Sequence, residues 1–181
     1  MNPKAGCSFV FKPSTAQPRD IGGYIRFLPL VEEPSSPKPV GPGYVRFRLE
    51  DRGLTAEIQP QTSNRAELRA VLAALRFRPW PNEGFNNLVI AADSAYVVEG
   101  ITCWVRGWLQ RDWRTRTGGA VKNRDLWERL LVEIDRLDED DMQVKFWRIP
   151  RDCNTDADYH AKHAASEDKL GAFSDIIGVD V

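Results

Sequence analysis

The stretch LVIAADS, residues 88–94, decides how this sequence folds. Its apolar residues follow one another without alternation, as in a strand that is covered on both faces. Asp93 comes directly after the run, at the carboxyl end of the expected strand, and this is where open α/β sheets place their ligand sites. The stretch therefore predicts a central strand that ends in an acid, Asp93, which is a candidate for a functional role.

The segments on either side predict the rest of an α/β fold. Upstream, we expect antiparallel strands at residues 6–12, 43–50 and 56–58 and a helix that begins at residue 64 and ends before Pro79. Downstream, we expect helices at residues 94–100, 101–110, 123–137 and 155–165 and a strand at residues 144–149. This order predicts a mixed α/β sheet, with antiparallel strands followed by a βαβ unit and helices on the faces of the sheet.

The length of 181 residues and the hydrophobic content of 42% fit a single domain with a substantial core. We expect this domain to span residues 1–170, with a flexible Pro-rich insertion at about residues 13–42 and a C-terminal tail at residues 171–181. The insertion contains GYIRFL, residues 23–28, which nearly repeats GYVRFR, residues 43–48. We assign the second copy to the sheet, and leave the first as an extra edge strand or a duplication.

The charge distribution is more informative than the net charge of −1. Between residues 104 and 124, one acid, Asp112, stands among six basic residues: Arg106, Arg111, Arg114, Arg116, Lys122 and Arg124. Such a local basic surface can bind phosphates on a nearly neutral protein. The three cysteines are far apart, which favours neither a disulfide framework nor a zinc site and indicates a reducing, intracellular environment. We expect no secretory signal and no membrane span.

Three acids in separate segments, Glu67, Asp93 and Asp158, are the candidate catalytic residues. Hard divalent cations such as Mg²⁺ take oxygen ligands, and two of them can clamp a phosphate that undergoes in-line displacement. The three acids therefore predict a metal-dependent nuclease.

Each acid also has an ordinary structural explanation. Asp93 is placed to cap a helix, Glu67 could complete a capping box with Asn64, and Asp158 could do so with Thr155. Position alone leaves both interpretations open.

Four motifs, TSNRAELRAVLAAL, DSAYVVEGITCWVRGW, VKNRDLW and WRIPRDCNTDAD, occur in an order and at spacings that closely resemble type 1 ribonuclease H, particularly its fungal form. The resemblance covers residues 5–11 and 43–165. It implies a ribonuclease H-like fold and cleavage of the RNA strand of RNA–DNA hybrids with two Mg²⁺ ions, or with Mn²⁺. It makes Glu67, Asp93 and Asp158, rather than Asp156, the metal ligands, and no obligate protein partner is evident.

The resemblance also implies a set of hybrid-binding residues. Tyr96, Trp104 and Trp108 would belong to a DNA-binding channel. Thr62 and Asn123 would bind phosphate, Asn154 would precede the last ligand, and Ser63 and Asn64 would reach the minor groove, where 2′-hydroxyl contacts distinguish RNA from DNA. Independently of the resemblance, Arg116 is one of the arginines interleaved with tryptophans that we expect to form the surface for the DNA strand. The alternative for the tryptophans is the core, and we expect at least one to pack inward.

Three further residues lie near the last motif. Arg151 is a candidate phosphate contact. His160 and His163 have the (i, i+3) spacing of an exposed helical face, and we assign them no catalytic role.

The family pattern has four carboxylates, the first of them at the end of an opening strand. Residues 1–11 resemble instead the loop and strand that follow it, so we expect that strand and its aspartate to be missing and activity to be weak or absent. Residues 23–28 could fill the vacant place in the sheet. The competing function is a non-catalytic hybrid-binding module. A strand-transfer or junction-cutting nuclease is a third, against which residues 104–123 argue.

Overall fold

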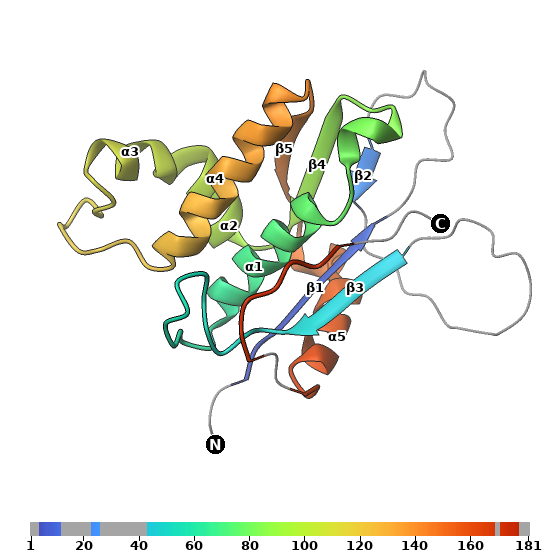
Figure 1. The fold of residues 1–181 in the computed structure, drawn as a ribbon, viewed down its shortest axis with the longest axis horizontal. Coiled ribbons are helices and arrows are strands. Elements are labelled where there is room, and N and C mark those ends of the chain that lie inside the picture. The colour runs from blue at the N-terminus through green and yellow to red at the C-terminus, as the bar shows by residue number, and fades with distance from the viewer. Residues whose placement is uncertain (1–3, 12–22, 26–42, 169–170, 178–181) are drawn as a thin grey trace, which may run out of the picture.

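A computed structural model describes residues 4–11, 23–25, 43–168 and 171–177. Its strands form two sheets (Figure 1). In the first, β1 (Gly6–Phe11) pairs antiparallel with β3 (Gly43–Arg48), from Gly6 opposite Arg48 to Phe11 opposite Gly43. The second is parallel and has the order β2-β4-β5, with β2 at Gly23–Ile25, β4 at Asn87–Ala92 and β5 at Gln143–Arg148. The expected mixture of antiparallel strands and a βαβ unit is confirmed.

The central position predicted for the LVIAA run is also confirmed, because β4 pairs with a strand on each side. Its register runs from Asn87 opposite Gln143 to Ala92 opposite Arg148 on β5. On its other side, the backbone of Gly23–Ile25 pairs with residues 88–90. The first copy of the near-repeat therefore does occupy a place in the sheet, while its remaining residues 26–28 lie outside the described part of the chain.

The prediction of a strand at residues 56–58 is wrong. This segment forms only an isolated bridge between Ile58 and Arg52. The reason is a tight turn in which Ala56 takes a positive φ of 60° and donates its N–H to the carbonyl of Gly53. Residues 53–56 form this turn, so Ala56 cannot belong to a strand and only residues 57 and 58 of the expected segment follow it.

Helices cover the sheets, as Figure 1 shows. Their bounds are α1 (Ser63–Arg76), α2 (Ala95–Glu99), α3 (Val105–Gln110), α4 (Arg124–Glu139) and α5 (Thr155–Ala164), with short 3₁₀ turns η1 (Trp80–Glu83) and η3 (Arg151–Cys153). The two helices expected between residues 94 and 110 are joined by a π-helical turn, η2 (Gly100–Trp104). Only glycine fits at its first position, since a Cβ on Gly100 would lie 2.3 Å from the ring of Trp127.

Helix α1 buries Leu68, Leu72 and Leu75 and packs against α4 and β1. In the described ranges, no helix is long and apolar enough to cross a bilayer.

A buried ion pair ties α1 to the end of β3. Arg69 on α1 contacts Glu50 at 2.6 Å, and only 2% and 3% of the two side chains are exposed. The guanidinium lies over the rings of Phe47 and Phe173, at 4.7 and 4.3 Å from their centroids. It also donates to the carbonyl of Ser174 at 2.6 Å. The described part of the C-terminal segment, residues 171–177, therefore packs against α1 (Figure 1).

We expect Arg69→Met to lower the free energy of unfolding by about 3–5 kcal/mol, because it leaves the Glu50 carboxylate buried without a partner. Urea denaturation measures the loss. The double variant Arg69→Met/Glu50→Leu removes both charges and should recover most of it. Equal destabilisation of the single and double variants would show that packing, and not the unpaired charge, is the cause.

Candidate active site

Glu67 of α1 and Asp93 at the end of β4 line one cavity of about 70 Å³, together with Ser8 and Asn154. This volume exceeds the ~10–15 Å³ that one water molecule needs. Glu67 accepts a hydrogen bond from the hydroxyl of Ser94 at 2.5 Å, and Asp93 accepts one from the amide of Asn154 at 2.6 Å. Two acids that are 26 residues apart in the sequence thus meet where the central strand ends.

None of the three candidate acids has the helix-capping role that its position in the sequence suggested. Ser94, not Asp93, is the N-cap of α2, and its hydroxyl accepts from the N–H of Val97. Thr62 caps α1 and accepts from the N–H of Arg65. Helix α5 begins after Asn154, and no side-chain hydrogen bond caps it. The capping explanations for Glu67, Asp93 and Asp158 are therefore wrong.

The electrostatics of the cavity favour a cation. Burial raises the pKa of Glu67 and the negative charge of Asp93 raises it further, against the hydrogen bond from Ser94 and the charge of Arg151, which lower it. In the described part of the chain, Oδ1 of Asn154 is buried and accepts no hydrogen bond. The cavity thus offers two carboxylates and an amide oxygen without a partner, a donor set that suits a hard divalent cation.

Asp158 is not among the residues that line this cavity, although its neighbour Ala157 is. Its carboxylate forms ion pairs with Arg151 at 3.6 Å and with Lys162 one helical turn later. Across the described residues, no three His, Cys, Asp or Glu side chains are close enough together to hold a metal ion. The structure thus brings together two of the three expected ligands, and the role of Asp158 stays a prediction.

The expected hybrid-binding residues lie mainly at the starts of α1 and α4 and around α3. Thr62, Ser63 and Asn64 are exposed at the start of α1. Trp104 is 38% exposed, whereas Trp108 and Trp113 are buried, which confirms that at least one tryptophan packs inward. Arg116 and the other basic residues of the 104–124 segment are exposed: Arg106, Arg111, Arg114, Lys122 and Arg124.

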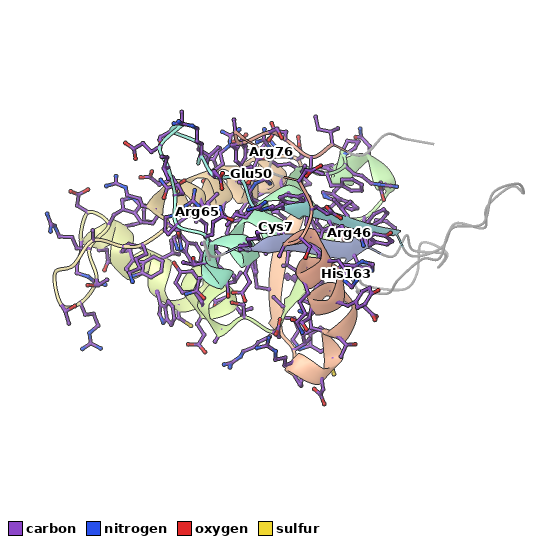
Figure 2. The ribbon with its side chains drawn as sticks, turned by 90° about the horizontal axis from the view of Figure 1, so that it is seen from below. Cys7, Arg46, Glu50, Arg65, Arg76 and His163 are labelled. Atoms are coloured by element: carbon purple, nitrogen blue, oxygen red, sulfur yellow. The ribbon has the colours of Figure 1, made fainter. Side chains whose placement is uncertain are left out.

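Sequence reasoning missed Arg65, which joins the starts of α1 and α4. Its side chain is 3% exposed and forms a bidentate pair with Asp125, at 2.9 and 2.6 Å. It also donates to Oδ1 of Asn123 at 3.4 Å. Figure 2 shows Arg65 well away from Arg46 and His163. Helical spacing could have predicted its burial, because Arg65 precedes Leu68 and Leu72 by three and seven residues and so shares the buried face of the helix.

Comparison with known proteins agrees with this geometry. The family model for RNase H matches residues 34–166. The chain is 38% identical over 122 residues to a ribonuclease H of Xanthomonas oryzae, a match that covers 65% of this chain and 75% of the relative. It is 39% identical over 102 residues to a ribonuclease H of Pectobacterium atrosepticum, covering 56% and 64%.

The chain belongs to the ribonuclease H family. Its fold also matches the crystal structure of LC9-RNase H1, a type 1 RNase H with the type 2 active-site motif. That match has a TM-score of 0.50 and 20% identity and covers 92% of this chain and 74% of the other. The particular likeness to fungal members stays a prediction.

Members of the ribonuclease H family use divalent metal ions. Glu67, Asp93 and Asn154 fit such an ion, because all three residues line the same cavity and carry hard oxygen donors. The buried Oδ1 of Asn154 is the particular observation that this fit explains.

The expectation that His160 and His163 share an exposed face is wrong for His160. Only 4% of His160 is exposed, and its ring stacks on Tyr44 with centroids 3.9 Å apart. Helix α5 packs against β1 and β3, so this position faces the strands, while His163 is exposed. Burial, followed by the charge of Arg46, lowers the pKa of His160. The ring is therefore part of the packing between α5 and the strands.

Without divalent cations, we expect Glu67→Gln to stabilise the protein at neutral pH. Folding raises the pKa of Glu67, so ionisation of this carboxyl favours the unfolded chain as the pH rises from its ordinary pKa through the raised one. The gain should vanish below the ordinary carboxyl pKa, where both states are protonated. Thermal unfolding with a chelator across this range measures it, and exposed Glu57→Gln is the control. A gain that does not vary with pH would contradict the raised pKa.

Proposed function

We propose that this protein is an endonuclease that hydrolyses the RNA strand of RNA–DNA hybrids through two divalent cations, Mg²⁺ in the first place and Mn²⁺ as the alternative. Membership of the ribonuclease H family supports the substrate and the reaction. The observation that carries the proposal is the pair Glu67 and Asp93, which lines one cavity at the carboxyl end of the central strand.

Glu67, Asp93 and Asn154 would hold the cations, and Asp158 would join them once its carboxylate leaves Arg151 and Lys162. When bound, such cations lower the pKa of the attacking water and stabilise the leaving 3′-oxygen. The protein itself supplies position and charge: Ser94 fixes the Glu67 carboxylate and Asn154 fixes that of Asp93. Arg151, when it leaves Asp158, becomes available to a phosphate.

The hybrid would lie across the start of α1 and the segment from η2 to the start of α4. Exposed arginines there can hold phosphates, and the half-exposed ring of Trp104 can pack against a sugar or base, which gives affinity without sequence readout. Ser63 and Asn64 are exposed in the first turn of α1, directly before the first buried residues of the helix. Their polar side chains suit the 2′-hydroxyls that distinguish RNA from DNA.

We expect turnover by this chain to be weak. The resemblance implies four carboxylates, whereas the described residues place two in the cavity and a third in ion pairs. Strand β2, beside β4, is Gly23-Tyr24-Ile25 and contributes no acid. The engagement of Asp158 by two basic residues is also what favours the second candidate function, a hybrid-binding module without turnover.

Lys162→Met should tighten Mn²⁺ binding about twofold, because it frees the Asp158 carboxylate from an exposed (i, i+4) pair of about 0.3–0.5 kcal/mol. Isothermal titration calorimetry measures the affinity. Lys145→Met, at an exposed position on β5, is the matched control for loss of one positive charge. Unchanged affinity in Lys162→Met, or the same gain in the control, would exclude Asp158 as a ligand.

Cleavage of a hybrid labelled on its RNA strand tests the function. We expect Mg²⁺- or Mn²⁺-dependent cleavage of the RNA, and a loss of at least about a hundredfold in Glu67→Gln and in Asp93→Asn. Asp156→Asn, at the start of the same helix as Asp158, should retain the wild-type rate. Hybrid binding without cleavage would select the binding module, and cleavage that survives Glu67→Gln would refute the proposed site.

A further inference from the structure

The hydroxyl of Tyr96 is engaged in three hydrogen bonds within the protein. It donates to the carbonyl of Lys122 at 3.1 Å. It accepts from the amide Nδ2 of Asn123 at 3.2 Å and from the indole N–H of Trp127 at 3.1 Å. A phenol has one proton to donate and one oxygen to accept with, so these partners use its capacity. The hydroxyl itself is therefore committed to the protein and not to a ligand.

The amide of Asn123 is held from both ends. Nδ2 faces the Tyr96 oxygen, and Oδ1 faces the guanidinium of Arg65 at 3.4 Å. Because an arginine only donates hydrogen bonds, it requires an acceptor opposite it, and this fixes which end of the amide faces which partner. One of the two N–H groups of Nδ2 is used by Tyr96, which leaves the second for another acceptor.

The backbone at Asn123 is constrained by the same groups. Asn123 has a φ of 57° and a ψ of 32°, in the left-handed region, at the N-cap of α4. Asparagine tolerates this conformation better than most residues, but it persists only where the surroundings enforce it. Tyr96 holds the carbonyl that precedes Asn123, and Arg65 is itself fixed by its bidentate pair with Asp125.

The held amide lies among exposed basic residues. Lys122 and Arg124 flank it in the sequence, and both are exposed, whereas Asn123 is half-buried. The start of α4 adds the positive end of a helix dipole. An N–H group oriented within such surroundings suits a phosphate oxygen.

We propose that Tyr96 and Arg65 are positioning residues for hybrid binding, which orient the Asn123 amide so that its second N–H donates to a backbone phosphate. This inference rests on the proposed function. Tyr96 acts through Asn123, and its ring, edge-on to Trp104 with centroids 6.3 Å apart, remains part of the predicted channel. Tyr96→Phe therefore removes the positioning group and keeps the aromatic surface.

A double-mutant cycle tests the proposal. Affinity for a fluorescent RNA–DNA hybrid is measured in chelator, which prevents cleavage, for the wild type, Tyr96→Phe, Asn123→Ala and the double variant. We expect Tyr96→Phe to weaken binding about two- to tenfold in the wild type, as the loss of one hydrogen bond would, and to have no further effect when Asn123 is alanine.

A purely structural role predicts a different result. Tyr96→Phe leaves Trp127 and the Lys122 carbonyl without a partner in either background, so a general structural effect would weaken binding equally in both. Equal losses, or no loss in the wild type, overturn the inference. A second cycle with Arg65→Lys, which retains the charge and loses the bidentate geometry, probes the other end of the amide and should show the same coupling.

Failure of the proposed function gives a separate outcome. If the wild type binds no hybrid, the proposed function falls, and this inference falls with it. If the wild type binds but the cycles show no coupling, only the positioning role is overturned.

Discussion

The repulsion between two carboxylates in one partly buried cavity is the constraint on which the candidate active site depends. Glu67 and Asp93 are carried by different elements, and a partly buried site strengthens their mutual repulsion relative to water. An unconstrained chain would move them apart. The fold holds them together because Leu68 and Leu72 anchor α1 and Ile90 anchors β4 in the same core. Burial of these apolar side chains thus holds two negative charges close together in the cavity, and a cation bound there would relieve their repulsion.

Two buried arginines set the orientation of the helix that carries Glu67. Arg65 and Arg69 are one turn apart on α1, on either side of Glu67 in the sequence, and each is paired with a carboxylate from another element. Arg65 reaches Asp125 on α4, and Arg69 reaches Glu50 beyond β3. Because the guanidinium group binds a carboxylate in a fixed planar geometry, the two pairs limit both rotation and translation of the helix. The position of the acid is thereby set by its neighbours.

Hydrophobic periodicity predicted most of the elements, and local hydrogen bonding explains where it failed. The helical spacing in α1 predicts its buried stripe, whereas in β4 Leu88, Ile90 and Ala91 are buried and Val89 and Ala92 only partly so. At residues 56–58, the alternation was too short to outweigh the turn at Ala56. His160 was misplaced because its helix has polar residues on both faces, so that packing against Tyr44 cannot be read from spacing.

The sequence predicted which acids form the candidate site, but it did not predict their hydrogen-bond and ion-pair partners. Glu67 and Asp93 follow from strand and helix positions together with the family motifs. The hydrogen bonds from Ser94 and Asn154 depend on side-chain directions that no spacing encodes. The pair between Asp158 and Lys162 has readable (i, i+4) spacing, whereas Arg151 reaches Asp158 only because η3 turns the chain before α5.

Burial determines which of these ion pairs can exchange with a cation. The side chains of Lys162 and Arg151 are 72% and 79% exposed, and exposed pairs contribute only about 0–1 kcal/mol. Breaking a buried pair such as that of Arg69 costs about 3–5 kcal/mol. A divalent cation that binds Asp158 therefore has little to displace, while the pairs that orient α1 remain intact. Ion pairing to a carboxylate thus provides a fixed anchor in the core and an exchangeable contact at the exposed Asp158.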